Sequence, residues 1–322
     1  MTADYSEMLL LNKERLYFYS PYKFIRERDQ DTIFTQTVFA PLLEKMNRHL
    51  VTVKNILIDH ESHYLIIEPL TWDSNYFEMP VYKLFTVLYA HDRYSLLKRA
   101  MLQWTSEISK GMHCMYMIEI PSEDTALIQA ACESGLRLTE TRLHYTLSDI
   151  HSYCKERYAV RTATEDDIEN LRKVAIQMRN PYDRLHADIS IQREMADAYV
   201  ATYIENSVRG FADLVLVPAE GTGPPDGFHT CSIYPERILG KRIAKFGIVA
   251  VSQETRKGWH VKLLSETIHF LKDKEIDYIL VNTQASNRPA NRILESFGFT
   301  LVFVTHIFSK NIEYNGEHTR VP

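Results

Sequence analysis

The stretch that decides the fold covers residues 248–299 and reads IVAVSQETRKGWHVKLLSETIHFLKDKEIDYILVNTQASNRPANRILESFGF. It begins with a short β-branched run, after which apolar residues recur at helical spacing from Val261 to Leu271. A second strand is predicted from Asp277 to Val281, and a second helix from Asn287 to Ser296. The predicted order is therefore strand, basic turn, helix, strand, loop, helix.

The basic turn before the first helix contains Arg256, Lys257 and Gly258. A helix N-terminus presents free backbone N–H groups and the positive end of the helix dipole. Such a terminus suits a phosphate or a pyrophosphate, and Gly258 would let the ligand approach the backbone closely. The turn has neither the Walker pattern nor the three glycines of a dinucleotide fingerprint. The alternative is a basic helix start on a solvated face.

Taken together, these features resemble the acyl-CoA-binding half of the Gcn5-related N-acetyltransferase (GNAT) superfamily over about residues 157–310. The resemblance implies an α+β protein of two domains. Residues 157–322 would form a GNAT fold with a mixed central sheet flanked by helices, and residues 1–150 a smaller, partial GNAT-like α/β domain. The partial copy is indicated by Gly135 and Gly298, each of which ends a predicted helix before a strand. The first sixty or so residues have no counterpart in the resemblance.

The resemblance also implies acetyl-CoA or another acyl-CoA as co-substrate and suggests which residues bind it. A strand splayed at a bulge would turn backbone N–H groups of Ile248, Val249 and Val251 toward the pantetheine arm and the thioester oxygen. The pyrophosphate would lie on the loop and Asn287 would brace the pantetheine, the loop residues being Arg256, Lys257, Gly258, Trp259 and His260. His260 stands where the family usually has a small residue.

A second departure from the family is Leu294, which stands where a tyrosine often protonates the leaving thiolate. A thiol has a pKa of about 8.5, so the thiolate is a tolerable leaving group without that tyrosine. The missing side chain would also leave room for a longer donor such as 3-hydroxybutanoyl-CoA. We expect the amine to attack the thioester directly, with no acyl-enzyme. A non-catalytic acyl-CoA-binding module is the alternative that Leu294 favours.

Residues 67–77 and 199–210 resemble sugar-nucleotide N-acyltransferases of the dTDP-fucosamine N-acetyltransferase type. They imply a dTDP-linked amino-dideoxyhexose as acceptor, in the synthesis of a surface polysaccharide such as the lipopolysaccharide O-antigen. Other GNAT acceptors, a protein amine or an aminoglycoside, stay open. An aromatic turn and a polar loop would bind the acceptor between the domains, the residues being Trp72, Tyr76, Phe77, Tyr182, Arg184 and Asp188. Asp183, His186 or Asp188 could take the ammonium proton, with His229 as a rival.

The amino-acid composition narrows the class of protein and its possible partners. The chain is 45% hydrophobic and 25% charged, as in ordinary globular proteins, and its net charge of −5 argues against nucleic acid as a partner. Four scattered cysteines show neither metal nor disulfide spacing and favour a cytoplasmic location. We expect no membrane span, because no apolar run is long enough. A homodimer is the default expectation for the assembly.

Overall fold

The computed structural model describes residues 5–110, 113–220, 223–252 and 258–312. It divides into two compact units: unit 1 is Met1–Thr141 with Thr305–Pro322, and unit 2 is Arg142–Val304. The sequence predicts domains of 1–150 and 157–322, whereas in the structure residues 305–312 of the last strand group with unit 1. Two strands carry the chain from one unit to the other, namely β5 (Arg137–Leu147) and β11 (Thr300–Ile312).

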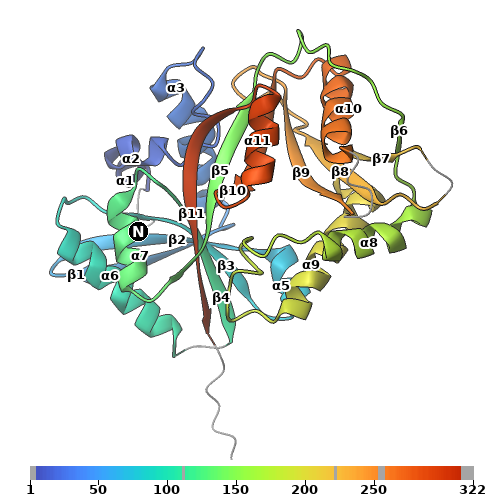
Figure 1. Ribbon diagram of the computed structural model, residues 1–322. Coiled ribbons are helices and arrows are strands. Elements are labelled where there is room, and N and C mark those ends of the chain that lie inside the picture. Colours follow the sequence, from blue (N-terminus) through green and yellow to red (C-terminus); the bar gives the residue numbers. More distant parts are fainter. Residues whose placement is uncertain (1–4, 111–112, 221–222, 253–257, 313–322) are drawn as a thin grey trace, which may run out of the picture. The chain divides into compact units, whose positions relative to one another are not determined.

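Unit 1 begins with short helices and continues as alternating strands and helices (Figure 1). Its elements before β5 are α1 (Tyr5–Leu11), α2 (Lys13–Tyr17), α3 (Gln30–Phe34), a π-turn (Thr35–Phe39), α4 (Ala40–Asn47), β1 (Thr52–Ile58), β2 (Glu61–Pro69), α5 (Thr71–Phe77), β3 (Val81–Leu88), α6 (Tyr94–Ile108), β4 (Cys114–Pro121) and α7 (Thr125–Glu133). Its strands are ordered β1-β2-β3-β4-β11. The β3–β4 pair is parallel, and the others are antiparallel.

The sheet of unit 1 is covered on both faces because successive strand residues point to opposite sides. Leu65 and Val87 pack with α6 and α7 in one apolar cluster. Ile66 and Leu88 pack with α1 to α4 in another. The N-terminal segment, which the family resemblance does not account for, therefore covers one face of this sheet.

Unit 2 contains the stretch that opened the sequence analysis. Its elements between β5 and β11 are β6 (Val160–Thr162), a 3-10 turn (Glu165–Asp167), α8 (Ile168–Gln177), α9 (Arg193–Asn206), a π-turn (Ser207–Phe211), β7 (Leu214–Pro218), β8 (Gly227–Ile233), β9 (Ile243–Val251), α10 (Trp259–Asp273), β10 (Tyr278–Gln284) and α11 (Arg288–Ser296). Its strands are ordered β5-β10-β9-β8-β7-β6. Only β9 and β10 pair in parallel among the described strands of this unit.

The two faces of this sheet follow from alternation along β7. Leu214 and Leu216 pack with α10, whereas Val215 and Val217 pack with α8 and α9. Helix α10 and the pair α8–α9 accordingly lie on opposite faces of β7, β8 and β9 (Figure 1). The amphipathic pattern predicted from Val261 to Leu271 is confirmed for Leu264, Ile268 and Leu271, which lie in the core against the sheet, whereas Val261 is 37% exposed.

The helix–glycine–strand repeat is confirmed in both units. Gly135 follows α7 with φ of +81°, and Gly298 follows α11 with φ of +85°. In each case the next N–H reaches back into the helix, from Leu136 to Ala131 O at 3.1 Å and from Phe299 to Leu294 O at 3.1 Å. Glycine is favoured there because side chains rarely adopt a left-handed backbone. The order strand, helix, strand, helix, glycine, strand occurs once per unit.

Two further expectations can be compared with the structure. The aromatic segment at residues 72–77 is predicted as a turn, but residues 71–77 form helix α5, so that prediction is wrong. Ser74 Oγ donates to Leu70 O at 2.8 Å and accepts from Val81 N at 2.9 Å, which fastens the helix to β3. No helix within the described ranges is long and apolar enough to cross a membrane.

Candidate functional site

A β-bulge in β9 is the first distinctive feature of unit 2. His229 of β8 pairs with Val249 of β9, and Cys231 of β8 pairs with Phe246 of β9. Two residues of β9, Gly247 and Ile248, therefore oppose a single residue of β8.

Thr230 is that single residue, and its side chain replaces the missing backbone partner. Its hydroxyl oxygen accepts from Ile248 N at 2.8 Å. A Cβ at Gly247 would lie 2.2 Å from Thr230 Oγ1 and 2.8 Å from the Tyr203 hydroxyl. Glycine is therefore required at this position by close approach. Sequence reasoning missed both Gly247 and Thr230, although a lone glycine inside a strand pattern is a recognised bulge signal.

The second feature is the parting of β9 from β10. Their parallel register runs from Tyr278↔Ile243 to Leu280↔Lys245 and then ends. Beyond it, residues 246–251 of β9 pair with β8, and residues 281–284 of β10 pair with β5. We call these two facing segments the strand opening. Within the described strands, each segment is paired on its outer side only.

The strand opening leaves backbone groups of β9 directed away from β8. Since Ile248 N points to Thr230, alternation along the strand directs the N–H of Val249 to the opposite side. That side is the one from which β10 has parted. An unpaired N–H at such a place can bind a carbonyl or an oxyanion. The splay expected at residues 248–251 is thus present in the strand pairing.

Helix α10 begins just beyond β9. Gly258 is its N-cap, with φ of +78°, and Trp259 and His260 stand in its first turn. The Trp259 side chain is buried in the core with Leu263 and Leu264, so only its backbone can contribute to binding. Arg256 and Lys257, the predicted cations of the pyrophosphate loop, lie outside the described residues.

Two neutral histidines lie close together at the start of α10. His229 is buried, its Nδ1 lies 2.8 Å from Thr267 Oγ1, and that hydroxyl donates to Leu263 O. Burial, with a smaller contribution from His260, lowers the pKa of His229 to about 3. Burial lowers the pKa of His260 to about 4. Neither ring adds positive charge at neutral pH, so an anion at this helix start depends on backbone N–H groups and the preceding loop.

Helix α11 begins across the opening. The Asn287 side chain accepts from Ala290 N at 3.3 Å and so caps the helix. Asn291 lies one turn further on the same face, and its Oδ1 is buried with no hydrogen-bond partner among the described residues. Leu294 is buried in the apolar core. Asn287 and Asn291 are two polar groups at the N-terminal end of this face of α11.

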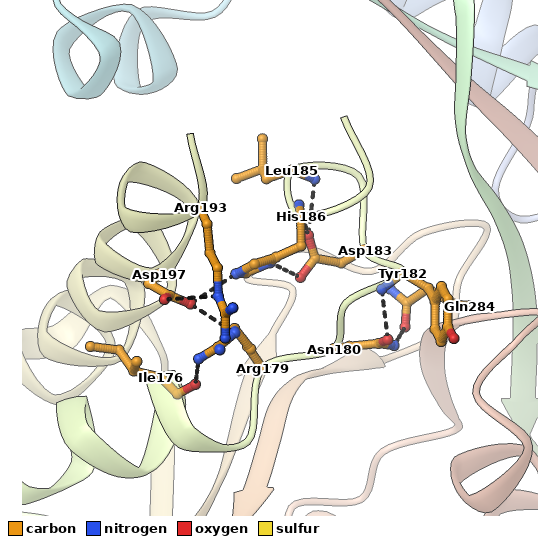
Figure 2. Close-up of polar contacts among 10 residues, drawn as sticks. All are labelled: Ile176, Arg179, Asn180, Tyr182, Asp183, Leu185, His186, Arg193, Asp197 and Gln284. Carbon is orange, nitrogen blue, oxygen red and sulfur yellow. Dashed lines mark hydrogen bonds and ion pairs between the residues drawn. The ribbon is translucent and has the colours of Figure 1, made fainter. Parts of the chain in front are cut away.

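The loop between α8 and α9 is built around His186, as Figure 2 shows. Its Nδ1 lies 2.7 Å from Asp183 Oδ2, and its Nε2 lies 3.1 Å from Asp197 Oδ1. The other oxygen of Asp183 accepts the backbone N–H groups of Leu185 and His186 at 2.9 and 3.0 Å. Arg179 Nε approaches Asp197 at 3.2 Å, so the cluster joins both helices.

These contacts fix the charge of the ring. Burial alone would lower the pKa of His186, but hydrogen bonds and charges from Asp183 and Asp197 outweigh it and raise that pKa. Burial would raise the pKa of Asp183, but its hydrogen bonds from His186 outweigh it and lower that pKa. Both ring nitrogens donate to carboxylates, which leaves His186 no lone pair for a substrate proton. This geometry argues against His186 or Asp183 as the general base and gives both a positioning role in the loop.

The same loop is anchored to the strand opening. Asn180 Nδ2 donates to Gln284 Oε1 at 2.6 Å, and Gln284 is the last residue of β10 (Figure 2). Asn180 Oδ1 accepts from Tyr182 N at 3.0 Å. The predicted acceptor loop is therefore fastened to β10, the strand that faces the predicted coenzyme strand β9 across the opening.

The remaining predicted acceptor residues of this loop differ in exposure. The Tyr182 side chain is 58% exposed and available to a ligand. Arg184 donates to the Tyr199 hydroxyl at 2.8 Å and lies over its ring. Asp188 is 2% exposed and accepts from Ser190, so it shapes the loop from inside.

The predicted aromatic residues 72–77 belong to unit 1. Trp72 and Tyr76 stack on α5 with ring centroids 5.7 Å apart and an interplanar angle of 11°. Tyr76 meets Phe77 edge to face at 5.0 Å. Phe77 is buried, whereas Trp72 is 38% exposed. Trp72 is therefore accessible to a ligand and Phe77 is not.

A surface cleft of about 580 Å³ lies beside the end of β9 on the α8 side. Its lining includes two cations, Lys173 and Arg179, together with Asp226 and Ser252. The volume falls in the range of small-molecule sites, about 300–1,000 Å³. The sequence reasoning did not select these lining residues, because α8 and the segments next to β8 and β9 that form the cleft are far apart in the sequence.

Comparison with solved structures identifies the architecture. The crystal structure of a GCN5-related N-acetyltransferase from Sphaerobacter thermophilus aligns with a TM-score of 0.51 at 15% identity, covering 79% of this chain and 78% of that chain. The chain has the GNAT fold. Because neither unit alone makes up 79% of the chain, the similarity to that GNAT structure extends over both.

Two other GNAT structures align over nearly the full length. An acetyltransferase of the GNAT family from Colwellia psychrerythraea covers 95% of this chain and 97% of its own, with a TM-score of 0.49 at 12% identity. A tandem GNAT protein from the clavulanic acid biosynthesis pathway covers 98% of each chain, with a TM-score of 0.47 at 11% identity. No protein-family model and no curated protein sequence matches the chain.

Proposed function

We propose that this chain is an acyl-CoA-dependent N-acyltransferase whose donor site is the strand opening of unit 2. The observation that carries the proposal is the end of β9–β10 pairing at Lys245 and Leu280, beside a bulge held by Thr230. An extended pantetheine arm has amide groups that can pair with an unpaired strand edge. Asn287 and the buried, unpartnered Asn291 Oδ1 add polar groups on the facing helix.

The donor's pyrophosphate would lie at the start of α10. Gly258, Trp259 and His260 contribute backbone N–H groups there, and Arg256 and Lys257 precede them in the sequence. The helix dipole favours an anion at this end. We propose that the N–H of Val249, with Ile248 and Val251 beside it on β9, stabilises the thioester oxygen as it gains charge.

The chemistry would be direct transfer. The neutral amine attacks the thioester carbon, the C–S bond breaks, and the coenzyme leaves as a thiolate. With a reference pKa of about 8.5, the thiol needs no dedicated acid in place of Leu294. An amine with a pKa of about 8, such as an α-amino group, is partly neutral at pH 7 and can pass its proton to water.

The acceptor we propose is a nucleotide-linked amino-dideoxyhexose, with a dTDP sugar as the first candidate. Lys173 and Arg179 line the cleft on the α8 side, and Arg184 stands in the same loop as the exposed Tyr182. Cations of this kind suit a diphosphate. We place the reaction in the cytoplasm, in keeping with the four free cysteines, and in surface-polysaccharide synthesis.

Thiol release tests this proposal. Acetyl-CoA and 3-hydroxybutanoyl-CoA are offered with a panel of dTDP-amino sugars, a peptide amine and an aminoglycoside. We expect release that depends on an amino sugar. Binding of the coenzyme with no thiol release in the presence of any of these amines would instead establish the non-catalytic module that Leu294 favours. Release with the peptide or the aminoglycoside alone would overturn the sugar acceptor.

The variant Gly247→Ala tests the donor site. Its Cβ would meet Thr230 Oγ1 and displace the bulge, so we expect acyl-CoA affinity to fall at least about tenfold, or about 1.4 kcal/mol. Gly223→Ala is the matched control, since a Cβ there meets nothing within 4 Å. Equal affinity in both variants would remove the strand opening from the donor site.

A further inference from the structure

Unit 1 contains a second strand opening. The parallel register of β3 and β4 runs from Val81↔Met115 to Leu84↔Ile118 and then ends. The β2–β3 register shifts at the same level, where Ile66 pairs with Thr86 and Ile67 with Leu84. Residues 85–88 of β3 and 119–121 of β4 thus repeat the arrangement of β9 and β10 in unit 2.

The helix that follows β4 also repeats its counterpart. Asp124 caps α7 through its side chain, which accepts from Leu127 N at 3.3 Å. Asn287 caps α11 in the same way. Each opening is therefore bounded by a bulged strand on one side and by the polar N-cap of a helix on the other.

The opening of unit 1 is bridged by Arg15 of α2. Its Nη1 donates to Asp124 Oδ2 at 2.8 Å and to Thr86 Oγ1 at 3.1 Å. Its Nη2 donates to Val87 O at 2.5 Å and to Asn12 Oδ1 at 2.7 Å. One guanidinium thus joins the end of β3 that has parted from β4 to the cap of α7.

Neighbouring side chains complete the closure. The Tyr19 hydroxyl donates to Asp124 Oδ2 at 2.7 Å, and the Arg15 guanidinium lies 4.8 Å from the centroid of the Tyr89 ring. Asn12 donates to Tyr89 O at 3.1 Å. The Asp124 side chain is 2% exposed and that of Arg15 is 18% exposed. A buried carboxylate needs such a partner, because an unpaired charge there is strongly unfavourable.

We infer that the N-terminal segment is an internal plug, in which Arg15 fills in unit 1 the place that the coenzyme takes in unit 2. The chain consequently binds one coenzyme molecule, in unit 2. The assignment of the plug rests on the contacts above, whereas the stoichiometry rests on the proposed function. The plug also gives a role to the N-terminal residues that the family resemblance leaves unexplained.

Chemical rescue tests the plug. Arg15→Ala leaves a guanidinium-sized space beside the unpaired Asp124, and we expect its melting temperature to fall by about 5–10 °C. Methylguanidinium at a non-denaturing concentration should raise the melting temperature of this variant and not that of the wild type. Arg48→Ala is the matched control, because Arg48 forms an exposed pair with Glu44. A melting temperature equal to that of the control, or one that methylguanidinium does not change, would overturn the plug.

Native mass spectrometry with coenzyme A tests the stoichiometry. We expect one molecule per wild-type chain, and its loss in Gly247→Ala with no loss in Arg15→Ala. Two molecules per wild-type chain would overturn the inference. No binding at all would refute the proposed function instead, and the rescue experiment would still decide whether Arg15 closes unit 1.

Discussion

At the scale of single residues, the candidate site depends on one side chain replacing a backbone partner. Thr230 is fully buried, and its hydroxyl accepts the N–H of Ile248 at the bulge. Without that acceptor, the N–H would be buried beside Gly247 with nothing to bond, at a cost of about 1–3 kcal/mol. Thr230 is therefore a positioning residue that holds β9 in the bulged form.

The prediction for Thr230 separates its hydroxyl from its size. Thr230→Val keeps the shape and removes the acceptor, so we expect the KM for acyl-CoA to rise about tenfold or more with a smaller change in kcat. Thr230→Ser keeps the hydroxyl and should restore KM to within a few-fold of the wild type. Steady-state kinetics with varied acyl-CoA provides both numbers. Identical KM values for Val and Ser would show that the hydroxyl does not position the strand.

At the scale of elements, the loop between α8 and α9 shows what local sequence could and could not predict. The density of Asp183, Arg184 and His186 within a few residues correctly indicated a polar centre. The roles of these residues could not be predicted from the loop sequence alone, because Asp197, whose carboxylate binds the second ring nitrogen of His186, belongs to α9. A histidine between two carboxylates is a cation that fixes a loop, whereas one beside a single carboxylate could serve as a base.

The charge state of His186 predicts how stability depends on pH. Its pKa is raised in the folded chain by Asp183 and Asp197, against the effect of burial. The stabilisation is therefore complete below the unfolded pKa of about 6.5 and is lost as pH rises through the raised folded value. Asp183 has a lowered folded pKa, so its contribution is fully present above the unfolded pKa of about 3.9 and is lost as pH falls from there through the lowered folded value.

Urea unfolding of His186→Gln tests whether the stabilisation by His186 decreases as pH rises. We expect the variant to lose about 1–3 kcal/mol near pH 6 and progressively less as pH rises through the raised folded pKa of His186, because the wild-type ring loses its proton there. The exposed His151→Gln is the control and should show no such change with pH. A loss that stays constant or grows toward pH 8.5 would mean that the ring is neutral in the folded protein.

Other elements were predicted to different degrees. The order from β9 to α11 was correctly inferred, because each element carries a strong local pattern and ends at glycine or a polar cap. Helix α5 was missed, since its seven residues contain three buried or stacked aromatics and an Asn and a Ser that also favour turns. What decides it is tertiary: Ser74 bonds to the start of β3.

At the scale of the whole molecule, the two units share strands. Residues 305–312 of β11 pair with β4 and place Phe308 in the core of unit 1, although the rest of the C-terminal half belongs to unit 2. Residues 142–147 of β5 likewise pair with β10 in unit 2. No local pattern distinguishes a strand that pairs with its own repeat from one that pairs with the other, which is why the sequence predicts two separate consecutive domains.

Sharing of strands predicts that the units unfold together. Trp104 is buried in unit 1 and Trp259 in unit 2, so single-tryptophan variants can report on each. Because either unit loses a strand when the other unfolds, we expect both probes to give the same urea midpoint. Phe308→Ala should remove about 3–5 kcal/mol from the core of unit 1 and lower both midpoints by the same amount.

The matched substitution for that test is Phe299→Ala, in the core of unit 2 immediately before the same strand β11. If the coupling is complete, the Trp104 probe should respond to it as strongly as the Trp259 probe does. Suppose instead that Phe308→Ala shifted only the Trp104 signal and Phe299→Ala only the Trp259 signal. The units would then be independent folding units, and the shared strands would serve only to connect them.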